Sequence, residues 1–200
     1  MALLFRFDRM ATMTAELYDE LVRRLEDRGA GAPPGRLYHV AYGPLDRLKV
    51  ADVWESPQQL QEFGKTLLPT AEELEVVLWE PDVNRVFDII RPPRTDVEGP
   101  PRLLVRFDPP GLNAGQYKEI RKRLDEAGLG APPERLYHVC YREDDQLRLM
   151  SVWQSEEALR AFYDRIVRIT ADLGIREVPR TTLEIEEVHH IIDGSAPHSR

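Results

Sequence analysis

The sequence has almost none of the cysteine that disulfide frameworks and cysteine-rich metal sites require. Cys140 is the only cysteine among 200 residues, so no internal disulfide can form, and a lone thiol suits a reducing compartment. No apolar run approaches the roughly 20 residues that a membrane-spanning helix needs. The N-terminal segment is charged by Arg6, too early for a signal peptide. These absences predict a cytoplasmic protein without a membrane partner.

Positive charge is outnumbered by negative charge. Lys and Arg number 27 against 35 Asp and Glu, a net charge of −8, and an acidic chain does not attract phosphate backbones or anionic lipid at long range. The sequence therefore predicts no nucleic-acid partner. It also lacks the patterns G-x-G-x-x-G, G-x-x-x-x-G-K-[ST] and G-x-S-x-G. The sequence therefore gives no support for a nucleotide-binding loop or for the nucleophile turn of a serine hydrolase.

The chain does contain an internal sequence repeat. Ala32-Pro-Pro-Gly-Arg-Leu-Tyr-His-Val-Ala-Tyr42 returns as Ala131-Pro-Pro-Glu-Arg-Leu-Tyr-His-Val-Cys-Tyr141, and 15 of 26 positions match between residues 31–56 and 130–155. Self-similarity on this scale indicates a repeated structural unit. We predict a first unit over 1–91, a proline-rich semi-rigid linker over 92–101, a second unit over 102–192 and a mobile tail over 193–200.

Each copy has the sequence pattern of strand, helix, strand, strand, helix, strand. Thr14 and Asn113 stand where helix N-caps belong, and Asn113 with Gln116 forms a capping-box pair. The order βαββαβ predicts an α+β fold of two tandem ferredoxin-like units, each an antiparallel sheet with both helices on one face. The bare faces need cover, so we expect the two sheets to pack face to face as a monomeric, intramolecular pseudo-dimeric α+β barrel.

The motifs Arg36-Leu-Tyr-His39 and Asp52-Val-Trp-Glu-Ser56, with their second-copy partners, resemble the dimeric α+β barrel superfamily and its antibiotic-biosynthesis-monooxygenase-like domains. The resemblance covers nearly all of both copies. It implies the barrel fold, and it implies a function among those of the superfamily, which includes cofactor-free oxygenases acting on polyketide quinols, lactone isomerases, cyclases and haem degraders. Most members build the barrel from two chains, whereas this chain would build it from one.

Alternation along the strands selects the polar candidates for a site. We expect two cavities, each with aromatic walls and a few polar groups, in which histidine transfers protons and arginine holds an enolate, phenolate or carboxylate. The candidates of the first copy are Arg6, His39, Asp52, Trp54 and Asp88. Their counterparts in the second copy are Arg106, His138, Ser151, Trp153 and His190.

Plainer interpretations apply to the same residues. His39 and His138 are equally consistent with buried, hydrogen-bonded core histidines, Trp54 and Trp153 with packing anchors, and Arg36 and Arg135 with surface or ion-paired residues. Tyr38, Tyr42, Tyr137 and Tyr141 are expected under the helices, on the face opposite the histidines. Cys140 is expected to fill buried space rather than act as a nucleophile.

Differences between the copies suggest that the two pockets are not equivalent. Asp52 becomes Ser151, and Asp88 becomes His190. This exchange favours His138 and His190 as the stronger acid/base pair, with His39 and Asp52 as the other catalytic candidates. Adjacent side chains on a strand point to opposite faces, so at most one of His189 and His190 is expected in a site, and we predict no metal.

Three functions remain open. The first is a cofactor-independent enzyme of secondary metabolism, either a monooxygenase or a cyclase/isomerase, acting on a small aromatic or polyketide-like substrate by histidine-assisted proton transfer. The second is a non-catalytic protein that binds a hydrophobic metabolite. The third is a structural pseudo-dimer with filled pockets.

Overall fold

The computed structural model describes residues 1–8, 13–91, 102–143, 146–176 and 182–194. Over these residues the chain is a mixed α+β protein with four helices and eight strands, and each repeat has the predicted order of strand, helix, strand, strand, helix, strand. In chain order the elements are β1 (Leu3–Phe7), α1 (Ala15–Asp27), β2 (Arg36–Tyr42), β3 (Lys49–Trp54), α2 (Pro57–Glu73), β4 (Asp82–Ile90), β5 (Leu103–Asp108), α3 (Ala114–Glu126), β6 (Arg135–Glu143), β7 (Gln146–Trp153), α4 (Glu156–Asp172) and β8 (Thr182–Asp193).

The helices begin at the capping residues that the sequence indicates. The Thr14 side chain accepts a hydrogen bond from the backbone N–H of Leu17 at the start of α1. At the start of α3, Asn113 and Gln116 form the reciprocal capping box, with both hydrogen bonds at 3.0 Å. These bonds satisfy backbone N–H groups that have no partner within the helix.

The described chain divides into two compact units whose limits differ from those of the sequence repeats. The first unit comprises Met1–Arg85 with Val188–Arg200, and the second comprises Val86–Glu187. The division therefore falls inside β4, after Arg85, and inside β8, after Glu187, whereas the predicted segments end after those strands. The predicted linker, 92–101, lies outside the described residues, as do residues 195–200 of the predicted tail. Asp193, assigned to that tail, is instead the last residue of β8 and pairs with Tyr38.

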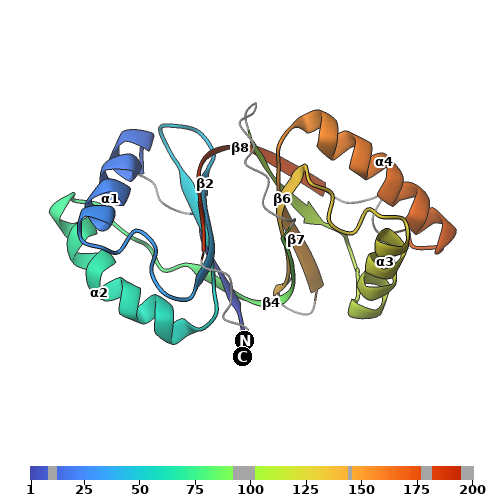
Figure 1. Ribbon diagram of the computed structural model, residues 1–200, viewed down its shortest axis with the longest axis horizontal. Helices are drawn as coiled ribbons and strands as arrows, with labels where there is room; N and C mark the ends of the chain where they lie inside the picture. Colours follow the sequence, from blue (N-terminus) through green and yellow to red (C-terminus); the bar gives the residue numbers. More distant parts are fainter. Residues whose placement is uncertain (9–12, 92–101, 144–145, 177–181, 195–200) are drawn as a thin grey trace. The chain divides into compact units, whose positions relative to one another are not determined.

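The sheet of the first unit has β1 between β3 and the first part of β4, and β2 between β3 and the last part of β8. All of these pairings are antiparallel. His39 of β2 is paired with Asp52 of β3 on one side and with Ile192 of β8 on the other. Helices α1 and α2 lie on one face of this sheet (Figure 1).

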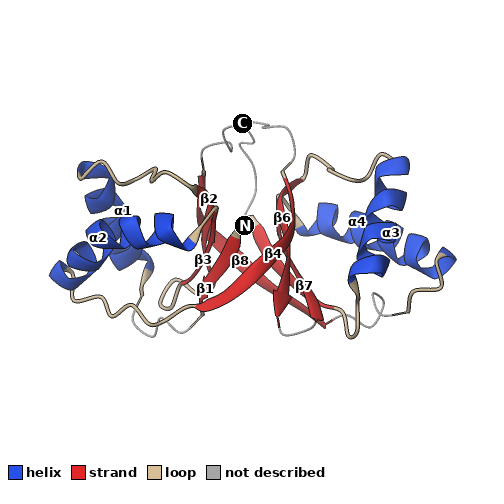
Figure 2. Cartoon of the chain, turned by 90° about the horizontal axis from the view of Figure 1, so that it is seen from below, coloured by secondary structure: helices blue, strands red, loops and turns tan. Residues whose placement is uncertain are grey.

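The second unit repeats this arrangement with other strands. β5 lies between β7 and the first part of β8, β7 lies between β5 and β6, and the strand next to β6 is β4. His138 of β6 is paired with Ser151 of β7. Helices α3 and α4 lie on one face of the sheet (Figure 2).

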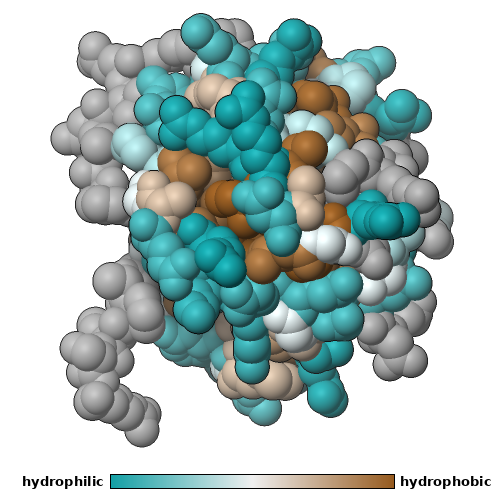
Figure 3. Space-filling view, turned by 90° about the vertical axis from the view of Figure 1, so that its right-hand side faces the viewer, coloured by the Kyte–Doolittle hydropathy of each residue, from teal (hydrophilic) through white to brown (hydrophobic). Residues whose placement is uncertain are grey.

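Each unit has a hydrophobic core between its helices and its sheet. In the first unit Trp54 packs against Phe63 of α2, with ring centroids 5.4 Å apart, and in the second Trp153 packs against Phe162 of α4 at 5.0 Å. Burying such side chains contributes about 1.5–3 kcal/mol each. Apolar side chains are also visible among polar ones on the side of the second unit that carries α3 and α4 (Figure 3). No helix among the described residues is long and apolar enough to cross a membrane.

Candidate functional site

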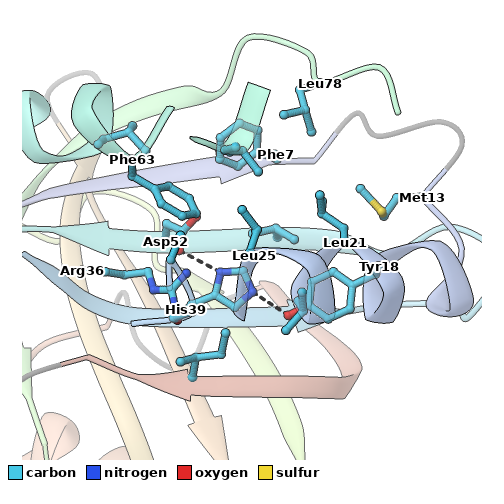
Figure 4. A pocket seen from close by; sticks show the side chains of 17 residues that line it. Phe7, Met13, Tyr18, Leu21, Leu25, Arg36, His39, Asp52, Phe63 and Leu78 are labelled. Atoms are coloured by element: carbon cyan, nitrogen blue, oxygen red, sulfur yellow. Dashed lines mark hydrogen bonds and ion pairs between the residues drawn. The ribbon is translucent and has the colours of Figure 1, made fainter. Parts of the chain in front are cut away.

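The first pocket lies between the sheet of the first unit and its two helices. Its cavity has a volume of about 70 Å³, enough for several water molecules. Its walls are mostly aliphatic and aromatic, and its polar side chains are Tyr18, Arg36, His39 and Asp52. In Figure 4 Arg36, His39 and Asp52 gather toward one end of the pocket, and Met13 and Leu78 lie toward the other.

A chain of hydrogen bonds runs through the polar end of the first pocket (Figure 4). His39 Nδ1 lies 2.8 Å from Asp52 Oδ1, and His39 Nε2 lies 2.7 Å from the Tyr18 hydroxyl. His39 is 7% exposed and Asp52 is 6% exposed. An ionised carboxylate can only accept a hydrogen bond, so the proton on Nδ1 points to Asp52 and the Nε2 of a neutral His39 accepts from Tyr18.

Two further histidines meet Tyr18 from β8. His190 Nδ1 lies 3.0 Å from the Tyr18 hydroxyl, and His189 Nε2 lies 2.7 Å from Asp19 Oδ1. The ring of each histidine stands edge-on to the Tyr18 ring, with centroids 5.6–5.8 Å apart. The expectation that adjacent histidines face opposite sides is therefore wrong here. The register of β8 against β2 shifts between Ala41 and Tyr42, and such a bulge turns an extra side chain out of its alternation.

The second pocket occupies the equivalent place in the second unit. Its cavity has a volume of about 50 Å³. The polar side chains that line it include Tyr117, Arg121, Arg135, His138 and Ser151. Its apolar walls include Trp153 and Phe162.

In the second pocket the carboxylate, Asp88, lies at the tyrosine end of the hydrogen-bond chain, whereas in the first pocket Asp52 lies at the Nδ1 side of the histidine. His138 Nδ1 lies 2.7 Å from Ser151 Oγ and His138 Nε2 lies 3.3 Å from the Tyr117 hydroxyl, which donates to Asp88 Oδ2 at 2.8 Å. Because Tyr117 gives its proton to Asp88, its oxygen accepts from His138 Nε2–H, and Nδ1 accepts from Ser151. A neutral His138 thus carries its proton on Nε2, whereas a neutral His39 carries it on Nδ1.

Burial shifts the pKa values of the histidine and tyrosine side chains in these hydrogen-bond chains. It lowers the pKa of His138 well below its ordinary value, with the positive charges of Arg135 and Arg121 adding to the effect, so His138 is neutral at neutral pH. It also lowers the pKa of His190, with a further contribution from His39 and His189. Burial raises the pKa of Tyr18 and of Tyr117 far above the ordinary range, so both hydroxyls keep their protons.

The structure redistributes the predicted site residues between the two units. His39 and Asp52 come together as expected, but the residue that joins them from the last strand is His190, not Asp88. Asp88 belongs to the second unit, with His138 and Ser151. The proposed pairing of His138 with His190 is wrong for the same reason, since the two lie in separate hydrogen-bond chains.

Both predicted arginines lie away from the pockets. Arg6 is on the strand face opposite Phe5 and lies 3.6 Å from Asp82, and Arg106 lies 3.5 Å from Glu184. Neither lines its pocket. Arg36 and Arg135, expected at the surface or in ion pairs, are instead buried and do line the pockets.

The aromatic residues also differ from expectation in part. Trp54 and Trp153 are both buried in the helix-facing cores, and Trp153 lines the second pocket. Tyr38 and Tyr42 are not under the helices, because His39 faces α1 and they alternate with it along β2. Tyr42 donates to Asp8 at 2.8 Å.

Tyr18 and Tyr117 were not predicted as site residues, although each contacts the histidine of its unit. The sequence does carry a signal for them, because the two tyrosines occupy equivalent positions in the two repeats. Tyr18 precedes the buried Leu21 and Leu25 of α1 by three and seven residues, and Tyr117 precedes Ile120 and Leu124 of α3 by the same intervals.

Within the described residues, no group of three or more His, Cys, Asp or Glu side chains is placed to hold a metal ion.

Comparison with known proteins identifies the fold. No protein-family model matches the sequence, and no curated protein matches it significantly. Among solved structures, the crystal structure of a "putative monooxygenase" from Lactobacillus acidophilus NCFM is similar over 96% of this chain and 95% of that chain, with a TM-score of 0.61 and 10% identity. A second "putative monooxygenase", from Fusobacterium nucleatum subsp. nucleatum ATCC 25586, covers 96% of this chain and 93% of its own, with a TM-score of 0.59 and 10% identity. The chain thus shares its mixed α+β fold with these bacterial proteins.

Proposed function

We propose that the protein is a cofactor-independent monooxygenase acting on a small aromatic or polyketide-like substrate, with the first pocket as its reaction site. The observation that carries this proposal is the Asp52–His39–Tyr18 hydrogen-bond chain at the polar end of an apolar pocket. Pockets of this kind, mostly apolar with a few convergent polar groups, are where small molecules bind.

The chain provides a route for a proton out of the pocket. Tyr18 lines the pocket, and its buried phenol cannot ionise on its own. Its oxygen can accept a proton from the substrate only as its own proton moves to His39 Nε2, 2.7 Å away. Asp52 then stabilises the resulting imidazolium through Nδ1, as a carboxylate behind a histidine does in other acid/base sites.

Loss of that proton leaves a carbanion or enolate that can react with molecular oxygen. For a benzylic methylene of an anthrone-like substrate, the carbon is oxidised to a carbonyl. One oxygen atom enters the product, and the other leaves as water with the two hydrogens of the methylene. One substrate and one O2 molecule thus give one ketone and one water molecule. The substrate supplies all four electrons. Reprotonation of the same carbanion at another carbon would instead be an isomerase reaction.

The second pocket is less suited to this step. His138 has a hydroxyl, Ser151, where His39 has a carboxylate, and its burial beside Arg135 and Arg121 disfavours the imidazolium. We therefore place the reaction in the first unit and give the second pocket a binding role.

The test uses anthrone as substrate with the full chain, in air and under strict anaerobiosis. We expect oxygen-dependent conversion to the quinone, lost in His39→Gln and retained in His138→Gln. Turnover without oxygen would contradict the monooxygenase proposal and indicate an isomerase reaction. Equal loss in both variants would remove the assignment to the first unit, and no turnover with retained binding would leave a metabolite-binding protein.

A non-catalytic, ligand-binding role is the second candidate. It is favoured by the hydrogen bonds themselves, because in each pocket both ring nitrogens of the central histidine already have a partner. Under this alternative, anthrone affinity survives both His39→Gln and His138→Gln.

The arrangement of the repeats is a separate proposal. We propose that each repeat is a ferredoxin-like unit and that the chain is a monomer in solution. The strand neighbours β4, β1, β3 and β2 in the first unit, in that order, support the first part. Light scattering coupled to size exclusion tests the second part, with a mass of 23.1 kDa expected.

A further inference from the structure

Arg36 and Arg135 are buried cations that line the two pockets. Arg36 is 4% exposed and Arg135 is 3% exposed. They occupy equivalent places at the start of β2 and β6. A guanidinium carries five N–H donors and keeps its charge at neutral pH, so burial is costly unless the charge and the donors find partners.

The described partners of each guanidinium are a backbone carbonyl and aromatic rings, which for Arg135 are Trp153 and Phe162 with centroids 5.9 and 5.1 Å away. Arg36 donates to the Gly31 carbonyl and lies over the Phe63 ring, 5.6 Å from its centroid. Arg135 donates to the Gly130 carbonyl, which Arg121 shares at 2.8 Å. Over the described residues, neither has an ion pair, and the Nε of each is buried without a hydrogen-bond partner.

Other arginines of the same units are paired differently. Arg6, equally buried, has Asp82 at 3.6 Å and Asp8 at 3.9 Å, and Arg121 has Asp88 at 3.4 Å. Asp52, the carboxylate among the described residues that line the first pocket, is hydrogen-bonded to His39 and acts on Arg36 through its charge without forming an ion pair. Of the described arginines that line the pockets, Arg121 therefore has a carboxylate within 4 Å, whereas Arg36 and Arg135 have none.

We propose that Arg36 and Arg135 anchor an anionic oxygen of the ligand, and that the ligand is an apolar ring system carrying a carboxylate, enolate or phenolate. In the apolar first pocket such an oxygen would give the guanidinium its ion-pair partner, and planar bidentate recognition of carboxylates suits arginine. The inference names the substrate class of the reaction site proposed above and rests on that assignment. An arginine in this place would also stabilise the carbanion that the proton relay creates, because that charge delocalises onto oxygen.

The experiment uses 2-naphthoate and the uncharged 2-naphthamide, which have nearly the same shape. Binding to the full chain is followed by calorimetry and by shifts of the His39 and His138 side-chain resonances. We expect the naphthoate to bind more than tenfold tighter than the naphthamide, with the preference falling at high salt. Arg36→Met should abolish the preference at His39 and leave it at His138, and Arg135→Met should do the reverse.

Several outcomes would overturn the proposal. They are equal affinity of the two probes for the wild type, binding of neither at millimolar concentration, or an unchanged preference in both variants. The wild-type comparison needs no variant to fold. A purely structural arginine predicts a large loss of melting temperature in Arg36→Met, whereas an unpaired cation replaced by an apolar chain of similar length predicts little loss or a gain. Anion preference without oxygen-dependent anthrone turnover would keep this site and remove the monooxygenase proposal.

Discussion

His39 and Asp52 lie directly opposite each other on β2 and β3, and His39 Nδ1 is 2.8 Å from Asp52 Oδ1. Side chains paired across antiparallel strands point to the same face and approach within contact distance. The pairing therefore holds the imidazole in one orientation, with Nε2 toward Tyr18. The second unit has the same pairing between His138 and Ser151, so a carboxylate in one unit and a hydroxyl in the other is the main chemical difference at this position.

Replacing the carboxylate should affect the reaction more than replacing the hydroxyl. We expect Asp52→Asn to lower the rate of oxygen-dependent anthrone conversion by about 100-fold, the lower range for acid/base assistance, because the imidazolium loses its counter-charge. Ser151→Ala is the matched control and should change the rate less than about threefold. Similar losses in the two variants would contradict a reaction confined to the first unit.

The two central histidines should be opposite tautomers. Long-range ¹⁵N–¹H correlation spectra at pH 7.5 should show His39 protonated on Nδ1 and His138 protonated on Nε2, since the carboxylates stand at opposite ends of the two chains. Asp88→Asn frees Tyr117 to donate toward His138 and should shift its tautomer, leaving His39 unchanged. Finding the same tautomer at both positions would disprove the assigned hydrogen-bond directions.

Removing the relay hydroxyl should separate activity from stability. Tyr18→Phe is expected to abolish turnover and to lower the free energy of unfolding by about 1–3 kcal/mol, because His39 and His190 each lose a buried hydrogen-bond partner. Tyr117→Phe should cost similar stability, measured by denaturant titration, while retaining turnover. A fully active Tyr18→Phe protein would rule out the relay.

Stability should fall on mild acidification because of His138. Its pKa in the folded protein is well below the ordinary value, so below about pH 6.5 the unfolded chain binds a proton that the folded chain does not. The free energy of unfolding then decreases by up to about 1.4 kcal/mol per pH unit as the pH falls. His190, with its pKa also lowered, acts in the same direction.

Denaturant titrations of the wild type and His138→Gln between pH 7.5 and 5 measure this effect. The stability difference between the two proteins should change over that range, with the wild type losing more on acidification. Parallel curves, or an NMR titration of His138 near pH 6.5, would contradict the buried neutral histidine.

Local chemistry allowed several features of the fold to be predicted. The caps at Thr14 and Asn113 and the order of the elements follow from side-chain hydrogen bonding and hydrophobic spacing, which act over a few residues. The pairing of His39 with Asp52 was also accessible, because a short connection between two adjacent strands limits their register.

The sequence did not allow us to predict which side chains meet in each pocket. Which last strand reaches which unit depends on contacts between separate elements, so His190 and Asp88 were assigned to the wrong partners. His190 pairs with Ala41 of β2, and Asp88 accepts from Tyr117 of α3. The position of His189 depends on the register shift in the pairing of β8 with β2. Arg36 illustrates a third limit, because an arginine at a strand entry is ordinarily solvated, and only packing against Phe63 and the helices buries it.

The elements, their caps, the duplicated motif and the residue types available for proton transfer can all be read from the sequence, because they follow from covalent order and interactions over a few residues. The tertiary structure decided which side chains meet. It placed Tyr18 against His39, turned both β8 histidines toward α1 and buried Arg36 and Arg135 beside the two pockets. These contacts join residues from separate elements, and their geometry depends on long-range strand pairing and helix packing.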